Sequence, residues 1–236
     1  MTLPISVYDF FGYIASGFLL LAAVEFGFDG NWLVEREWKP GLIGLYVPLA
    51  YIIGHIVASL ASHFLEHNFV RKCLGPSEEL LLGSEPKARA VWKWLFWSFF
   101  KPFSPKTKER IMEAAKAEGL TEVNRALYDH AFEVAKQDKT TFDRMNAFLN
   151  LYGFCRNVSF SLLLALLVIA VSGVWYAVFL DMKTPDTQKI SVGVLCVVGS
   201  VGMFYRYLKF YRLYTIEVLR AYPDLKKKHE KKKDGP

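Results

Sequence analysis

Four apolar stretches, separated by segments rich in charge, set the pattern of hydrophobic and polar positions along this chain. One of them covers residues 158–180, contains no Asp, Glu, Lys or Arg, and begins shortly after Arg156. A helix rises about 1.5 Å per residue, so this stretch would be roughly 34 Å long and would cross a hydrocarbon core of about 30 Å. The pattern therefore predicts a membrane-spanning helix at this position.

The other three stretches predict three further spans. Residues 7–28 and 42–65 would form a first transmembrane hairpin, and Pro48 predicts a kink in its second helix. Residues 190–208 are short for a span, but the Arg206 side chain can extend toward the headgroups while its stem stays in the apolar layer. With residues 158–180, this segment would form a second hairpin.

Residues 66–157, between the second and third spans, carry the charge that the spans lack. No run in them alternates apolar and polar residues for long enough to predict a strand. Caps and breakers instead predict helices near residues 77–82, 86–100, 105–118, 122–137 and from 142 onward. The fold class is therefore all-α: an integral membrane protein of four transmembrane helices, with a cytosolic helical domain inserted between the second and third.

Two long helices should continue the spans into water. Apolar positions from Phe142 to Tyr152 recur at helical spacing and predict one helix that enters the third span, with Thr141 as a candidate N-terminal cap. Beyond the fourth span, a helical pattern extends the second hairpin, so that it covers residues 158–222. Pro223 predicts the end of that helix, and residues 223–236 would be a basic tail without core-forming residues.

The basic residues predict the orientation. The formal charge is +6, and the connections 25–41 and 181–189 hold four of the 29 basic residues, whereas residues 66–157 and the C-terminal segment hold the other 25. By the positive-inside rule, both termini and the large domain should face the cytoplasm. Anionic lipid headgroups are the nearest negative surface for the lysines of the tail, namely Lys226, Lys227 and Lys228. Lipid explains the basic excess, so a nucleic-acid partner is not expected.

Small residues in three spans predict close contact between helices. Such faces let two backbones approach and favour helix association, here expected to include a homo-oligomer. The residues are Gly12 and Ser16, then Gly54, Ala58 and Ser62, and finally Gly199 and Gly202. His55 lies near the middle of the second span, where an ionisable group needs a partner. It is interpreted as a hydrogen-bonded packing residue, with a haem ligand or a proton relay as alternatives.

An aromatic cluster lies between residues 92 and 100, with Lys93 and Lys101 beside it. It is too short to cross a membrane. A helix in the lipid interface accounts for both the rings and the lysines, and would place there Trp92, Trp94 and Trp97. The alternative is that these rings form the core of the cytosolic domain.

Two short patterns resemble sites of chemistry. His63 and His67 have the i, i+4 spacing at which two imidazoles can share zinc, but two ligands do not make a site. They are interpreted as polar residues at the cytosolic membrane boundary. Arg125 and His130 match the Arg-x4-His spacing of HEPN-type ribonucleases, a spacing that arises easily by chance. The sequence thus predicts a protein without a metal, a cofactor or enzymatic activity. A membrane-tethered HEPN-like ribonuclease is kept as an alternative, ranked third behind the two classes of function given below.

Three short motifs occur in the membrane part: Tyr8-Asp9-Phe10-Phe11-Gly12-Tyr13, Gly54-His55 and Cys155-Arg156-Asn157. With these motifs the chain resembles a family of uncharacterised bacterial multi-pass membrane proteins, some of which lie beside antiviral defence genes. The resemblance covers mainly the spans. It implies the inner membrane of a bacterium as the location and antiviral defence as the setting, and it implies no catalytic residue.

Two classes of function follow from this organisation. The first is a non-enzymatic membrane sensor or scaffold subunit that presents its cytosolic helical domain to a partner protein. The second is an oligomeric ion channel or pore gated by that domain, in which polar positions of the spans would line water: His55, Ser59, Ser191 and Ser200. We favour the first class, because no span carries a regular stripe of polar residues.

Overall fold

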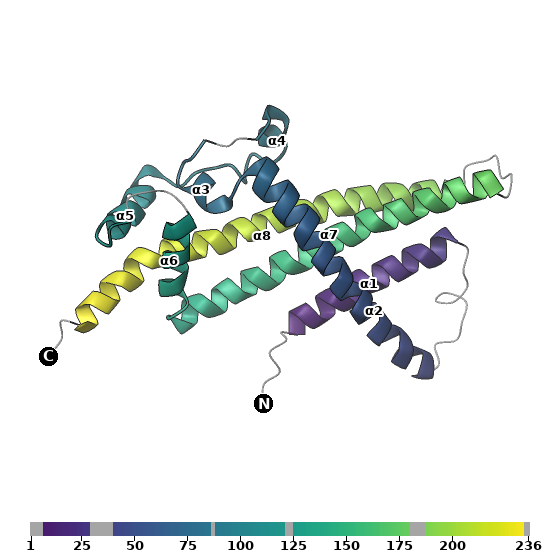
Figure 1. Cartoon of the computed structure of the whole chain (residues 1–236), viewed down its shortest axis with the longest axis horizontal. Helices are drawn as coiled ribbons and strands as arrows, with labels where there is room; N and C mark the ends of the chain where they lie inside the picture. Colours follow the sequence, from purple (N-terminus) through teal and green to yellow (C-terminus); the bar gives the residue numbers. More distant parts are fainter. Residues whose placement is uncertain (1–6, 29–39, 86–87, 121–124, 180–186, 234–236) are drawn as a thin grey trace. The chain divides into compact units, whose positions relative to one another are not determined.

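The structure is a computed structural model that describes residues 7–28, 40–85, 88–120, 125–179 and 187–233. Every regular element among these residues is helical and no strand occurs in them, which confirms the all-α prediction. Figure 1 shows the helices in chain order. Their bounds are α1 Val7–Gly27, α2 Pro40–Ala61, the π-helix η1 Ser62–Leu74, α3 Ser77–Leu81, α4 Ala90–Leu95, α5 Pro105–Lys116, α6 Arg125–Ala135, α7 Lys139–Phe179 and α8 Thr187–Lys233.

Four helical segments are long and apolar enough to cross a membrane. They lie within Phe10–Gly27, Ile43–Leu81, Lys139–Phe179 and Thr187–Lys228. This confirms the four-span pattern at the level of helix length and composition. The single 41-residue helix α7 also confirms that one helix leads into the third span.

The chain divides into two compact units. Unit 1 comprises Met1–Leu65 and Gly153–Tyr207, and unit 2 comprises Glu66–Tyr152 and Leu208–Pro236. Both α7 and α8 contribute residues to each unit. Unit 2 therefore corresponds to the predicted domain without residues 153–157, and it gains the C-terminal half of α8.

Helices α1 and α2 approach each other closely in unit 1. A Cβ atom placed on Gly17 would overlap the backbone of Ala50, and one placed on Gly54 would overlap the backbone of Tyr13. Only glycine leaves room for the facing carbonyl groups at these two points. The small residues of the first two spans thus serve a contact inside the chain.

The other predicted packing residues have mixed surroundings. Gly12 faces Phe154 of α7, and Gly199 faces Leu162 of α7, where an added Cβ would lie 3.0 Å from a methyl group. An added Cβ on Gly202 meets no atom within 4 Å. Ala58 is buried, and Ser62, at the start of η1, is half-buried. Of the two glycines predicted on α8, only Gly199 therefore packs against another helix of unit 1.

Serine side chains connect the helices of unit 1. The Ser161 hydroxyl of α7 donates to the carbonyl of Ser16 in α1 at 3.1 Å. Ser159 and Ser200 form a reciprocal pair, because each hydroxyl donates to the other residue's carbonyl at 2.9 Å. All four serines are buried. Such bonds satisfy hydroxyl groups that an apolar surrounding would leave unpaired.

The core of unit 2 is built mainly from α3, α5, α6, α7 and α8. Its buried side chains include Leu81, Ile111, Leu127, Met145, Val218, Leu219 and Tyr222. The Tyr222 hydroxyl also donates to the Ala114 carbonyl of α5 at 3.3 Å. The last third of α8 is therefore part of the folded unit.

The prediction for the C-terminal segment was wrong. α8 continues through Pro223 to its end, and Leu225 and Lys226 are buried in unit 2. Lys226 donates to the Ala114 carbonyl at 2.8 Å and pairs with Glu118 at 3.1 Å. Proline removes one helical hydrogen bond, and these packing contacts offset that loss.

Two local predictions also need correction. The helix predicted over residues 86–100 is limited to α4 in its described part, and turns follow it, with the Phe99 amide donating to the Phe96 carbonyl at 2.8 Å. The cap of α7 is Asp138, whose carboxylate accepts from the amide and the hydroxyl of Thr141, each at 3.0 Å. Aspartate satisfies amides that a helix start leaves unpaired, so Thr141 is the donor and not the cap.

Candidate functional site

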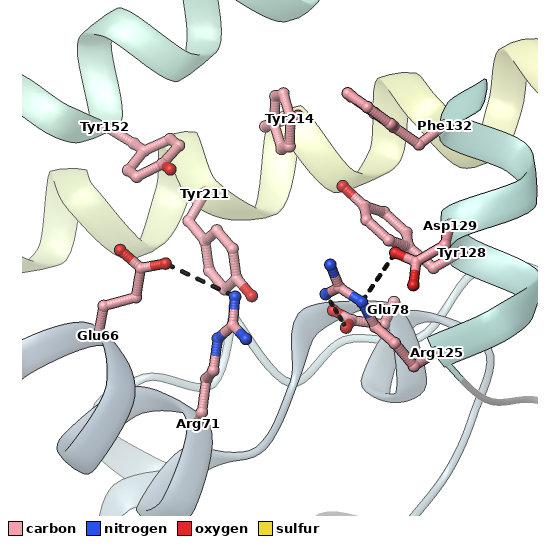
Figure 2. Close-up of a pocket in the computed structure, with 10 residues that line it drawn as sticks. All are labelled: Glu66, Arg71, Glu78, Arg125, Tyr128, Asp129, Phe132, Tyr152, Tyr211 and Tyr214. Carbon is pink, nitrogen blue, oxygen red and sulfur yellow. Dashed lines mark hydrogen bonds and ion pairs between the residues drawn. The ribbon is translucent and has the colours of Figure 1, made fainter. Parts of the chain in front are cut away.

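Unit 2 contains a cavity of about 190 Å³, here called the tyrosine pocket. Figure 2 shows the side chains that surround it. They come from η1, α3, α6, α7 and α8, and they are Glu66, Arg71, Glu78, Arg125, Tyr128, Asp129, Phe132, Tyr152, Tyr211 and Tyr214. All ten belong to unit 2.

Helical spacing brings these residues to one place. Arg125, Tyr128, Asp129 and Phe132 stand at i, i+3, i+4 and i+7 and so share one face of α6. Tyr211 and Tyr214 share a face of α8 in the same way.

The π-helix supplies an ion pair to the pocket. Glu66 and Arg71 lie five residues apart in η1, with an oxygen-to-nitrogen distance of 3.7 Å. The i to i+5 repeat of a π-helix aligns such a pair, whereas five residues of an α-helix turn the two side chains well apart.

Tyrosine rings form much of the pocket wall. The Tyr152 ring lies 5.9 Å from the Tyr211 ring and 6.2 Å from the Tyr214 ring, with interplanar angles of 65° and 58°. These are tilted arrangements that aromatic pairs favour. Tyr128 and Tyr211 are buried, while Tyr152 and Tyr214 are half-buried.

Arg125 joins two carboxylates at the pocket. Its guanidinium lies 3.1 Å from Glu78 and 2.8 Å from Asp129, and it sits over the Tyr128 ring at 5.1 Å. Burial by itself lowers the pKa of Arg125, but the charges of Glu78 and Asp129 outweigh that effect and raise it. Arg125 is therefore a permanent cation held by ion pairs.

Burial also raises the pKa of Tyr128, and the neighbouring Tyr214 and Glu78 add to this effect. The Tyr128 phenol therefore stays neutral at any physiological pH. The aromatic wall presents neutral rings and hydroxyl groups beside charged side chains. This combination suits binding of a ligand more than proton transfer at neutral pH.

Arg125 and His130 contact different partners, although both lie on α6. Arg125 lines the pocket, whereas His130 contacts the Glu118 carboxylate and meets the Tyr222 ring edge to face at 5.6 Å. Five residues of an α-helix separate two side chains by more than a third of a turn, which accounts for the difference.

His63 and His67 both lie in η1, and both side chains are exposed. In the part of the chain that the structure describes, no group of three or more His, Cys, Asp or Glu residues is placed to hold a metal ion.

His55 is exposed on the surface of α2 and belongs to a group of rings. It stacks on Tyr13 of α1 at 4.0 Å and meets Tyr51 edge to face at 4.6 Å. Ser59, one turn further, is also exposed. These contacts give the imidazole neighbours inside unit 1 and leave one side of it facing outward.

The three tryptophans near α4 have two different environments. Trp92 is half-buried and packs against Phe69 at 5.2 Å and Phe96 at 6.1 Å. Trp94 and Trp97 are 79% and 64% exposed. The predicted cluster thus divides into an inner ring that packs against Phe69 and Phe96 and two outer rings that are exposed.

The three lysines predicted to face lipid also differ. Lys226 is buried against α5, as described above, whereas Lys227 and Lys228 are exposed. Lys228 lies 3.8 Å from the Asp138 carboxylate.

Comparison with protein-family models, with curated proteins and with solved structures finds no match to this chain.

Sequence reasoning did not identify the tyrosine pocket. The helical spacing from Phe142 to Tyr152 places Tyr152 on an apolar face and does not indicate a pocket. The available signal was chemical, since Tyr211 and Tyr214 place two hydroxyl-bearing rings on one face of α8 in a segment already rich in charge. The partner residues come from segments far apart in sequence, and no local pattern relates them.

Proposed function

We propose that this protein is a membrane-anchored sensor or scaffold subunit whose helical unit 2 reports to a partner protein. The observation that carries this proposal is the tyrosine pocket. Its lining contains arginine, carboxylate and tyrosine side chains but no Ser, Cys or His that would serve as an activated nucleophile or its base. The lining supports binding, and a site that binds a ligand reports it by acting on another protein.

The helices that form the pocket support a sensing role. Tyr152 lies on α7, and Tyr211 and Tyr214 lie on α8. Both helices also contain a candidate membrane span. A ligand in the pocket would contact the helices that enter the membrane, and long helices transmit small shifts because packed interfaces have discrete arrangements.

The proposed setting is the inner membrane of a bacterium, with unit 2 and both termini in the cytoplasm and with antiviral defence as the process. The positive-inside distribution of Lys and Arg supports the orientation. The resemblance of the three motifs in the spans supports the setting.

Lipid contact is the proposed role of the two outer tryptophans. Val91, Trp94, Leu95 and Trp97 are exposed, with Lys93 beside them. Tryptophan is enriched at the membrane interface, and lysine there meets anionic headgroups. This surface would hold unit 2 close to the bilayer.

A pore is the second candidate, and the exposed position of His55 and Ser59 on α2 favours it. Polar groups at membrane depth face protein or water, so a second copy of the chain could cover this face or form a water path with it. Ser200 does not support a pore, because it is buried in the reciprocal pair with Ser159.

Ion flux separates the two candidates. The purified full chain is reconstituted in liposomes, and ion leakage is measured with a fluorescent dye. A sensor leaves the liposomes ion-tight. Conductance that changes in His55→Leu, with Gly44→Ala as an unaffected control on the same helix, would establish the pore and contradict the proposal.

A further inference from the structure

The size of the tyrosine pocket limits its ligand. At about 190 Å³ it is smaller than the roughly 300–1,000 Å³ of sites for drug-sized molecules. A nucleotide would not fit inside it. A compact group of a few heavy atoms does, such as an ammonium head.

Two carboxylates of the pocket are more deeply buried than its two guanidinium groups. The side chains of Glu66 and Glu78 are 14% and 6% exposed, whereas those of Arg71 and Arg125 are 43% and 55% exposed. With Asp129, the lining has one more carboxylate than it has guanidinium groups. The lining therefore carries a net negative charge, to which the exposed Asp129 contributes, and an anion placed beside Glu66 and Glu78 would meet two poorly hydrated carboxylates.

The aromatic wall adds attraction for a cation. A tyrosine ring carries negative charge on its face and attracts an ammonium or guanidinium group within about 6 Å of its centre. The pocket already shows this chemistry at its mouth, where the Arg125 guanidinium lies 5.1 Å from the centre of the Tyr128 ring. Elsewhere in the lining, the centre of the Tyr152 ring lies 5.9 Å from that of Tyr211 and 6.2 Å from that of Tyr214.

From size, charge and ring arrangement together, we infer that the tyrosine pocket binds a small organic cation, with a primary or quaternary ammonium group as the recognised element. The inference rests on the proposed sensor function and names its ligand class. The rings of Tyr152 and Tyr214 would contact the alkyl part of the ammonium group, and Glu66 and Asp129 would balance its charge. The Arg71 guanidinium lies 3.7 Å from the Glu66 carboxylate, and its side chain can turn outward to solvent so that the cation enters the pocket.

The test is calorimetric titration of the purified full chain with tetramethylammonium chloride. The detergent is a maltoside, which carries no ammonium group of its own. Sodium chloride at equal ionic strength gives the baseline, and sodium phosphate tests for an anion. We expect saturable binding of tetramethylammonium and none of phosphate.

Paired variants locate the binding. Asp129→Asn should weaken binding roughly tenfold because it removes a carboxylate next to the cation. Glu133→Gln is the matched control: it lies one turn further on α6, pairs with Lys136 at 2.5 Å and does not line the pocket. Tyr214→Phe keeps the ring and should change the affinity by less than about threefold, whereas Tyr214→Leu should weaken it by roughly fivefold or more.

Several results would overturn the inference: no saturable heat with tetramethylammonium, saturable binding of phosphate that is lost in Arg125→Gln, or equal weakening by Asp129→Asn and Glu133→Gln. If Tyr214→Leu lowers the melting temperature, its loss of binding could come from a disturbed fold. The affinity of Asp129→Asn then decides whether the pocket binds the cation, because the Asp129 side chain is 55% exposed and its loss leaves the core intact. Capture of a partner is measured on the same preparation. Capture of a partner protein without cation binding would contradict only the inferred ligand class. Cation binding without capture of a partner protein would contradict the proposed sensor function.

Discussion

Gly54 of α2 faces the backbone of Tyr13 in α1 so closely that a Cβ atom at Gly54 would overlap the Tyr13 carbonyl. One helical turn earlier on α2, Ala50 faces Gly17 of α1 in the same way. The crossing of the two helices therefore depends on two glycines, one on each helix. In lipid, no hydrophobic driving force brings helices together. Small residues at such crossings let the backbones approach, and the resulting van der Waals packing stabilises the contact.

Gly54→Ala should lower the free energy of unfolding by about 1–3 kcal/mol, because the added methyl group forces α1 and α2 apart. Gly44→Ala on the same helix is the control, since its Cβ would meet no atom within 4 Å. That variant should be neutral, or more stable by up to about 1 kcal/mol through helix propensity. Unfolding in mixed micelles measures both. Equal stability of the two variants would show that the crossing is not formed as described.

The cap of α7 predicts a dependence of stability on pH. Hydrogen bonds from the backbone amide and then the hydroxyl of Thr141 lower the pKa of Asp138. The folded state then binds the proton less tightly than the unfolded state, in which the pKa is about 3.9. The contribution of this group is therefore complete above the unfolded pKa and is lost as the pH falls through the folded pKa.

Asp138→Asn should flatten this acid-side decline while it keeps the melting temperature near neutral pH close to that of the wild type, because asparagine also caps helices. Asp138→Ala should lower the melting temperature at every pH. Melting curves from pH 3 to 7 give the comparison. An acid-side slope that is the same in Asp138→Asn and in the wild type would assign the pH dependence to other groups.

The division of the tryptophans predicts two kinds of variant. Trp92→Phe should cost about 1 kcal/mol or more, because a smaller ring leaves a gap beside Phe69 and Phe96. The double variant Trp94→Phe/Trp97→Phe should leave stability unchanged. In nanodiscs with brominated lipids, the double variant should lose part of the tryptophan quenching, whereas Trp92→Phe should keep it. Unchanged quenching in the double variant would mean that these rings do not touch lipid.

The cysteines test the orientation. Cys73 is exposed, whereas Cys155 and Cys196 are buried. Because unit 2 is proposed to face the cytoplasm, a membrane-impermeant maleimide should leave intact cells unlabelled. After permeabilisation it should label the exposed Cys73. Labelling that disappears in Cys73→Ser identifies the site. Labelling of Cys73 from outside intact cells would reverse the topology.

Hydropathy and helical spacing predicted the four long helices because both depend on local sequence. The same reasoning ended the last helix at Pro223, since a single missing hydrogen bond is visible in sequence, whereas the burial of Leu225 and Lys226 against α5 is not. It also had no means of finding the tyrosine pocket, whose residues meet only when η1, α3, α6, α7 and α8 fold together. The π-helical turn that pairs Glu66 with Arg71 has no reliable sequence signal.

Affinity capture of the tagged full chain from its native membranes tests the sensor function most directly. The wild type and the Gly44→Ala control should recover a soluble partner protein in a stoichiometric amount. Asp129→Asn, which alters the tyrosine pocket, should change the amount recovered. Two results together would contradict a sensor that reports to a partner and would establish a pore in its place. They are capture that recovers only copies of the chain itself, and ion conduction by the purified chain in liposomes.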